Sequence, residues 1–136
     1  MINHQLFLGL GSNLGDRAEN IRKAVLLIQE RVGEVVRQSS LIETEPWGFE
    51  SDHCFLNGVI LCETTLTPRQ VLRATQKIER ELGRKSKTTS SYADRPIDID
   101  ILLYDDLTVN EPDLKIPHPL MHERDFVMIP LREIRH

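Results

Sequence analysis

Two carboxylates stand two residues apart in a segment that has the composition of a β-strand. The segment reads RPIDIDILLY, residues 95–104, and the carboxylates belong to Asp98 and Asp100. Side chains alternate between the faces of a strand, so both acids point from one face. The opposite face carries Ile97, Ile99, Ile101 and Leu103. Aspartate is depleted in strands and like charges on one face repel, so a bound cation would explain the pair.

Mg²⁺ is the cation that suits this pair best. It takes oxygen ligands, keeps several waters and is commonly held by one or two carboxylates together with substrate phosphates. A solvated outer face that tolerates two acids is the alternative, because antiparallel sheets often have one face in water. Residues 95–104 alone do not decide between the two interpretations.

A polar segment, RKSKTTSSYADR, precedes the strand and spans residues 84–95. A connection of this length without apolar periodicity is often a lid or a binding loop. Its charged side chains are those of Arg84, Lys85, Lys87, Asp94 and Arg95. A solvated loop is the alternative, but Arg95 lies three residues from Asp98 and would bring cationic charge to the metal site. Carboxylates, metal and arginine together predict a polyphosphate site.

Three other segments carry side chains that could bind ligands. IPHPLMHERDF, residues 116–126, adds His118, His122 and Arg124, which would either contact phosphate or lie at the surface. Aromatic rings and an amide gather in residues 46–57 and could hold a flat heterocycle, although core packing is the alternative. The glycine-rich GLGSNLG, residues 9–15, fits neither a dinucleotide fingerprint nor a P-loop, and favours a tight strand-to-helix turn.

The composition is that of a soluble single domain. The chain has 136 residues, a net charge of −4, 40% hydrophobic residues and 28% charged residues. This charge argues against broad binding to nucleic acid or to an anionic membrane. Two cysteines are too few for a secreted disulfide framework, and the N-terminus has no basic leader. We therefore expect one cytoplasmic domain, residues 1–136.

The order of predicted elements is strand, helix, strand, strand, helix, strand. The first strand covers residues 4–11. A helical stripe follows, with Gly33 as the predicted stop, and its apolar positions are Leu14, Ala18, Ile21, Val25, Ile28 and Val32. Two β-favouring runs span residues 34–46 and 54–66. The second helix begins with a capping box and ends at Gly83, and the acidic strand follows residue 94. A possible edge strand at 114–118 and a short helix within 119–134 complete the chain.

This order predicts an α+β, ferredoxin-like fold. An antiparallel sheet would carry helices on one face and substrate loops on the other. The isoleucine face of the acidic strand would pack against the helices. The two carboxylates would then look onto the open face.

Six segments resemble those of a known family in order and spacing. They are GLGSNLGD, SSLIETEPWG, FLNGVI, QKIERELGR, RPIDIDILLY and IPHPLMHERDFVMIPL. The chain is similar over nearly its whole length to the 6-hydroxymethyl-7,8-dihydropterin pyrophosphokinases of folate biosynthesis. The resemblance implies a transfer of diphosphate from ATP to the pterin hydroxymethyl group that leaves AMP. It also implies two Mg²⁺ ions bound with ATP. We further expect a monomer, with no nucleic-acid or membrane partner.

The resemblance also implies roles for individual residues. The metal ligands would be Asp98 and Asp100, which with Arg84 and Arg95 would form the catalytic set. The ATP-binding residues would be Gln76, Glu79, Arg84, Tyr92, Arg95, Ile101, His118 and Arg124. The pterin-binding residues would be Thr44, Glu45, Trp47, Phe55, Asn57, Tyr92 and Phe126, with the two phenylalanines around the ring.

Several positions depart from the family pattern. Ser86 stands where an arginine is frequent, and Tyr92 and its neighbours replace a tryptophan-glycine-proline run. Glu45 stands at a frequent proline and Trp47 at a frequent leucine, and the sequence ends at His136, earlier than in many relatives. Two other functions remain open from the residues alone: another metal-dependent phosphotransferase or nuclease, and a non-catalytic binding module.

Overall fold

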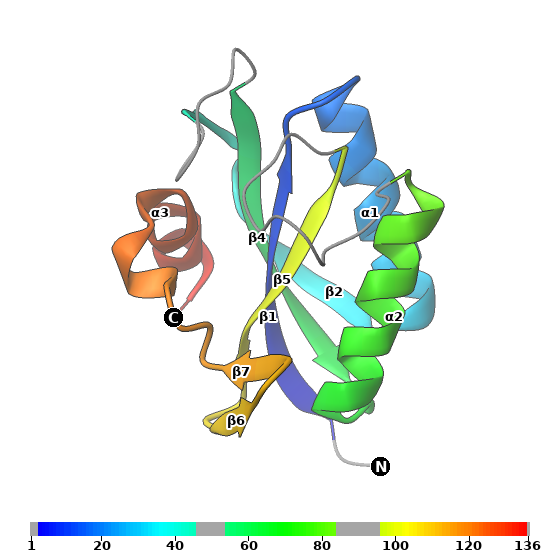
Figure 1. Ribbon diagram of the computed structural model, residues 1–136, viewed down its shortest axis with the longest axis vertical. Helices are drawn as coiled ribbons and strands as arrows, with labels where there is room; N and C mark the ends of the chain where they lie inside the picture. Colours follow the sequence, from blue (N-terminus) through cyan, green and yellow to red (C-terminus); the bar gives the residue numbers. More distant parts are fainter. Residues whose placement is uncertain (1–2, 46–53, 84–95, 136) are drawn as a thin grey trace.

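The computed structural model describes residues 3–45, 54–83 and 96–135 of the chain. Its elements follow the predicted order and add two short strands and a 3-10 helix (Figure 1). They are β1 (His4–Ser12), α1 (Arg17–Arg31), β2 (Glu34–Gln38), β3 (Ile42–Thr44), β4 (Phe55–Thr64), α2 (Pro68–Glu81), β5 (Asp98–Tyr104), β6 (Val109–Glu111), β7 (Leu114–Ile116), η1 (Met121–Glu123) and α3 (Asp125–Ile134).

The main sheet has five strands, and every strand pair in it is antiparallel. The strand order is β2-β4-β1-β5. β3 pairs with the first residues of β4, along the same edge of β4 as β2. β1 therefore lies in the centre and β5 at one edge. A separate hairpin is formed by β6 and β7. The split order of the βαβ units confirms the predicted ferredoxin-like class.

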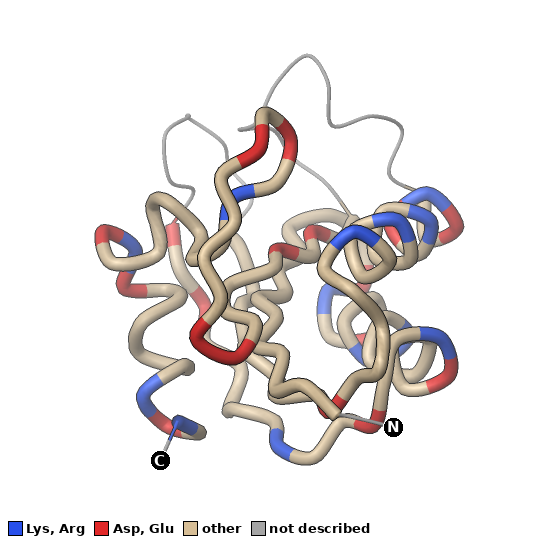
Figure 2. Tube along the Cα trace, turned by 90° about the horizontal axis from the view of Figure 1, so that it is seen from below, with Lys and Arg blue, Asp and Glu red and all other residues tan. Residues whose placement is uncertain are grey.

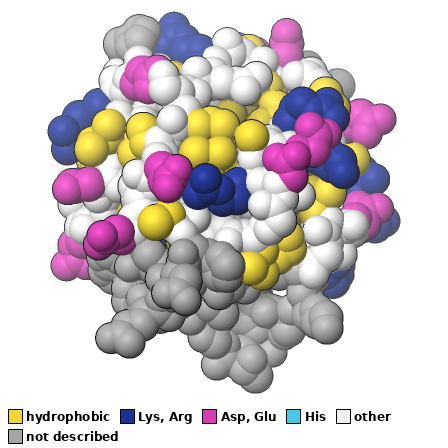
Figure 3. Space-filling model, turned by 90° about the horizontal axis from the view of Figure 1, so that it is seen from above, with side chains coloured by type: hydrophobic (Ala, Val, Ile, Leu, Met, Phe, Trp, Pro, Cys, Tyr) yellow, Lys and Arg dark blue, Asp and Glu magenta, His cyan; other side chains and the backbone are white. Residues whose placement is uncertain are grey.

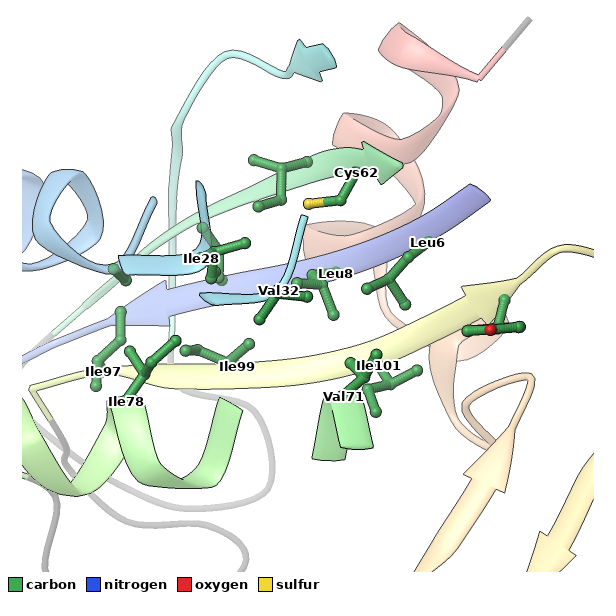
Figure 4. Close-up of a cluster of buried hydrophobic side chains, with 14 of the residues drawn as sticks. Leu6, Leu8, Ile28, Val32, Cys62, Val71, Ile78, Ile97, Ile99 and Ile101 are labelled. Atoms are coloured by element: carbon green, nitrogen blue, oxygen red, sulfur yellow. The ribbon is translucent and has the colours of Figure 1, made fainter. Parts of the chain in front are cut away.

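Helices α1 and α2 cover one face of this sheet (Figure 1). The core between them and the sheet takes the alternate residues of β1 and β5 that point inward, which Figure 4 shows in close-up. These include Leu6, Leu8, Ile97, Ile99 and Ile101, all at most 6% exposed. Burial of each such side chain stabilises the fold by about 1.5–3 kcal/mol.

The start of α2 follows its predicted chemistry closely. The Thr67 side chain accepts the Gln70 backbone N–H, the Gln70 side chain accepts the Thr67 N–H, and Pro68 opens the helix. Val71 and Ile78 are fully buried, and the helix ends before Gly83, whose φ of +105° suits a residue without a Cβ.

The first helix differs from its predicted pattern. Leu14 precedes α1 and Ala18 is exposed, whereas Ala24 belongs to the core. Gly33 lies two residues after the last helical residue, and its φ is not positive. A Cβ at this position would collide with the backbone carbonyl of Glu63 on β4. Gly33 is therefore required by the close approach of β4, rather than by the helix stop that the sequence predicted.

The third helix packs against the opposite face of the sheet and creates a second core (Figure 1). Its apolar residues meet β1, β4 and β5 through Phe7, Val59, Leu61 and Leu102. Leu102 is an extra residue in β5, because Leu8 pairs with Ile101 and Phe7 pairs with Leu103. This β-bulge breaks the side-chain alternation, so the predicted placement of Leu103 with the isoleucines is wrong.

Basic and acidic residues are interspersed along the described chain (Figure 2). None of the described helices is long and apolar enough to cross a membrane. Cys62 is fully buried, and burial raises the pKa of its thiol to about 12. Cys62 therefore serves as a packing residue of the first core.

Candidate functional site

The central strand β1 carries two glycines between the predicted metal strand and the predicted pterin pocket. In the register of the sheet, Gly11 lies opposite Asp98 on one side and Asn57 on the other, and Gly9 lies opposite Asp100. Directly opposed residues of neighbouring strands point to the same face. Asn57, Gly11 and Asp98 therefore form a row across three strands.

Gly11 leaves room for the side chains beside it. A Cβ on Gly11 would stand 2.7 Å from Asn57 Oδ1 and 3.4 Å from Phe55 Cδ1. The Asn57 amide therefore leans over the glycine. The tight turn that the sequence predicted lies further on, where Gly15 has a φ of +70°. Gly11 thus allows the close approach of the Asn57 side chain, whereas Gly15 allows the turn.

Asp98 and Asp100 are half-buried and lie on the face opposite Ile97, Ile99 and Ile101. The described residues contain no group of three or more His, Cys, Asp or Glu side chains that could enclose a metal. Two carboxylates on a half-open face fit a cation that completes its shell with water and phosphate oxygens. Mg²⁺ binds in this way, so the donor set fits the predicted ion.

A cleft of about 400 Å³ opens beside Asp100 at the edge strand β5. It brings together Gln76, Asp100, Ile101 and His118, which the sequence predicted as site residues. Leu72, Ile99, Pro112, Asp113, Leu114, Lys115 and Pro119 line the rest. The sequence did not predict these lining residues, because the β6–β7 hairpin had only one weakly signalled strand.

His118 is held in one orientation. Its backbone N–H donates to Leu102 O of β5, and its ring Nδ1 accepts the backbone N–H of Leu120 at 3.2 Å. In the neutral imidazole the proton then lies on Nε2, which makes that nitrogen a donor. Such a donor suits a phosphate or a ribose oxygen.

Glu79 is only 2% exposed, which is exceptional for a carboxylate. Its Oε2 accepts the backbone N–H of Ile99 at 2.7 Å. Ile99 is the residue between the two strand carboxylates. Glu79 is absent from the lining of the cleft. It joins α2 to the outer edge of β5 at the level of Asp98 and Asp100.

The predicted pterin residues gather partly on β3 and β4. Asn57 is 6% exposed, and its Nδ2 donates to Thr44 Oγ1 at 2.6 Å. Phe55 pairs with Thr44 in the register and is half-buried, whereas Glu45 is exposed. Phe126 lies in the first turn of α3, the helix that packs on β4, and Arg124 stands 5.5 Å from the centre of its ring.

Four predicted site residues lie outside the described residues. They are Trp47, Arg84, Tyr92 and Arg95. The segments that contain them are bounded by Glu45 and Cys54, and by Gly83 and Pro96. Figure 3 shows, in space-filling view, the end of the molecule at which β1 stops and β4 and β5 begin. Acidic, basic and hydrophobic side chains lie near one another on this face.

Arg17 is a site-adjacent residue that the sequence did not suggest. Its guanidinium donates to the backbone carbonyl of Cys54 at 2.9 Å and to Glu43 Oε2 at 3.2 Å. It thereby joins the start of α1 to β3 and to the residue before β4. A single arginine at a helix start has no sequence pattern that would reveal such partners.

A family model for 7,8-dihydro-6-hydroxymethylpterin-pyrophosphokinase (HPPK) matches residues 7–136. The chain belongs to this family. A relative from Porphyromonas gingivalis, a 2-amino-4-hydroxy-6-hydroxymethyldihydropteridine pyrophosphokinase, is 50% identical over 131 residues, which cover 95% of this chain and 89% of the relative. Pyrophosphokinases of the same name from Aquifex aeolicus and Bacillus subtilis are 43% and 40% identical, over 95% and 98% of this chain and 79% of each relative.

Solved structures share the fold. The HPPK-DHPS protein of Plasmodium falciparum superposes with a TM-score of 0.77 at 16% identity. The match covers 97% of this chain and 41% of the solved chain, so this chain spans about two fifths of that protein. At this identity the likeness concerns the HPPK fold alone.

We expect Glu79→Ala to destabilise the protein by about 1–3 kcal/mol, because the buried Ile99 N–H would lose its acceptor. Glu79→Gln keeps an oxygen at the same reach and should cost less. Urea unfolding followed by circular dichroism measures both free energies. Lys77→Ala, an exposed change on the same helix, is the control and should stay within about 0.5 kcal/mol. An unfolding free energy of Glu79→Ala equal to that of the control would contradict this role.

Proposed function

We propose that this HPPK family member transfers diphosphate from ATP to the hydroxymethyl group of 6-hydroxymethyl-7,8-dihydropterin in folate biosynthesis. The products are AMP and the pterin diphosphate. The observation that carries the proposal is the row of Asn57, Gly11 and Asp98 across three strands. It sets an amide for heterocycle recognition roughly 9–10 Å, two strand spacings, from a carboxylate pair beside a cleft.

The cleft beside β5 is the proposed ATP site. β5 is an edge strand, so alternate backbone N–H and C=O groups point away from the sheet. The outward N–H of Ile99 is taken by Glu79, and Ile101, two residues on, presents its own N–H in the same direction. A purine edge can pair with that backbone while Leu72 and Pro112 cover its faces.

The acid pair is the proposed metal site, and Asp98 and Asp100 would hold Mg²⁺ together with ATP. Two bound ions would neutralise the phosphate charge that develops during transfer. We further propose that Arg84 and Arg95 hold the terminal phosphates. His118, which lines the cleft and whose Nε2 is a donor, and Arg124 would contact ATP oxygens.

The pterin is proposed to bind over β3 and β4. Asn57 can pair with the ring edge while Thr44 holds its amide in place. Phe55 and Phe126 would contact the ring faces, and Glu45, Trp47 and Tyr92 would border the pocket. Because Gly11 has no side chain, the hydroxymethyl group can reach across β1 toward the acid pair.

The reaction then requires positioning more than covalent help from the protein. The hydroxymethyl oxygen bonds to the β-phosphorus, and the bond between that phosphorus and the α–β bridging oxygen breaks. The electron pair stays on the α-phosphate of AMP, and the hydroxyl proton passes to solvent. We propose that residues 1–136 do this as one cytoplasmic domain and as a monomer.

The nucleotide product tests the proposed reaction directly. We expect incubation of the protein with ATP, Mg²⁺ and the hydroxymethyl pterin to yield AMP and pterin diphosphate in equal amounts, as measured by ion-exchange chromatography. Stoichiometric ADP with a pterin monophosphate would instead indicate an ordinary kinase. The absence of any pterin-dependent nucleotide product would favour a non-catalytic binding module.

Substitution of the acids tests the metal site. We expect Asp98→Asn or Asp100→Asn to lower kcat at least about a hundredfold, because each removes an anionic ligand while conserving volume. Steady-state AMP production at limiting Mg²⁺ measures the loss, and circular dichroism checks the fold. Asp106→Asn, an exposed acid in the turn after β5, is the matched control. Near-normal activity in either strand variant would count against the assignment.

A further inference from the structure

The β6–β7 hairpin forms one wall of the cleft, and it is not part of the main sheet. Each of its strands has three residues, and a hairpin this short is not stable by itself. Two buried residues, Leu114 and Ile116, hold β7 against the core between the sheet and the helices. The turn between the strands, which reaches the cleft, needs a separate support.

Arg69 provides that support from the first turn of α2, the element that forms the facing wall. Its Nη1 donates to Asp113 Oδ2 and its Nη2 to Asp113 Oδ1, both at 2.7 Å. The same Nη2 also donates to Glu111. One guanidinium therefore makes a two-point contact with one hairpin acid and reaches a second. Such fork contacts fix orientation as well as distance.

The three side chains are partly exposed, so the fold gains little stability from the pairs themselves. Their position gives them another effect. Asp113 lines the cleft, next in sequence to Pro112 and Leu114, which line it too. Facing them are Leu72 and Gln76, one and two turns after Arg69 on α2. The ion pairs thus link the two walls and set their separation at this end.

The pairing also governs charge at the cleft. The hydrogen bonds from Arg69 hold the pKa of Asp113 below its usual value, and the same contacts raise the pKa of Arg69. Both groups are therefore charged at neutral pH.

We propose that Arg69 is a positioning residue for the nucleotide: its contacts with Asp113 and Glu111 hold the hairpin wall at the distance that the nucleoside end of ATP requires. This inference rests on the proposed function only in assigning the cleft to ATP. It places the nucleoside at the hairpin end because the phosphates would lie at Asp98 and Asp100. Arg69 does not touch the reacting atoms, so its effect falls on ATP affinity.

Kinetics of four variants and one control variant test the inference. We expect Arg69→Ala to raise the KM for ATP about threefold to tenfold, with kcat within about twofold and the pterin KM unchanged. Arg69→Lys keeps the charge but loses the fork, and should fall between Arg69→Ala and the unaltered protein. Asp113→Ala should resemble Arg69→Ala, and the double variant should be no worse than either single one. Arg73→Ala removes the same charge from an exposed position of α2 and is the control.

Calorimetric binding of a non-hydrolysable ATP analogue with Mg²⁺ provides a readout that does not require turnover. Arg69→Ala should weaken this binding by the same factor as it raises the KM. An unchanged KM and analogue affinity in folded Arg69→Ala, or additive losses in the double variant, would overturn the inference. If the unaltered protein forms no AMP but Arg69→Ala still weakens analogue binding, the proposed reaction fails and the positioning role stands.

Discussion

The burial of three isoleucines beneath α2 determines where the acid pair points. Ile97, Ile99 and Ile101 are at most 6% exposed, and each contributes about 1.5–3 kcal/mol of burial. Repulsion between like charges on the opposite face costs well under this, about 0.2–1 kcal/mol. The apolar face therefore decides the register, and Asp98 and Asp100 must share the other face. A shift of β5 by one residue would bury both carboxylates and expose the isoleucines. The loss of isoleucine burial makes this register unfavourable.

β1 lies between β4, which carries Asn57, and β5, which carries the acid pair. A strand between β4 and β5 would ordinarily place a side chain between those of its neighbours, but Gly11 has none. Asn57 occupies part of the space over Gly11 and is held there by Thr44. The amide that we propose to bind the heterocycle and the acid pair that we propose to bind the metal therefore lie on the same face of the sheet. Glu79 stabilises the strand from its outer edge, at the residue between the acids.

The sequence predicted those features that depend on neighbours along the chain. The capping box of α2, the alternation through Ile101 and the order of the main elements all follow from local spacing. It missed those that depend on distant partners. Nothing near Leu102 signals a bulge, because the bulge is defined by the pairing of β5 with β1. Arg69 and Asp113 are separated by 44 residues, and an exposed arginine and aspartate have no pattern that would match them.

The proposed reaction requires the pterin hydroxymethyl group to lie over Gly11, next to the acid pair of β5. A crystal structure of the protein with Mg²⁺, a non-hydrolysable ATP analogue and the hydroxymethyl pterin tests it most directly. We expect Mg²⁺ at about 2.0–2.1 Å from carboxylate oxygens of Asp98 and Asp100, with the pterin ring edge on Asn57 and its hydroxymethyl oxygen over Gly11. A pterin bound elsewhere, or a metal held by ATP without either carboxylate, would contradict it.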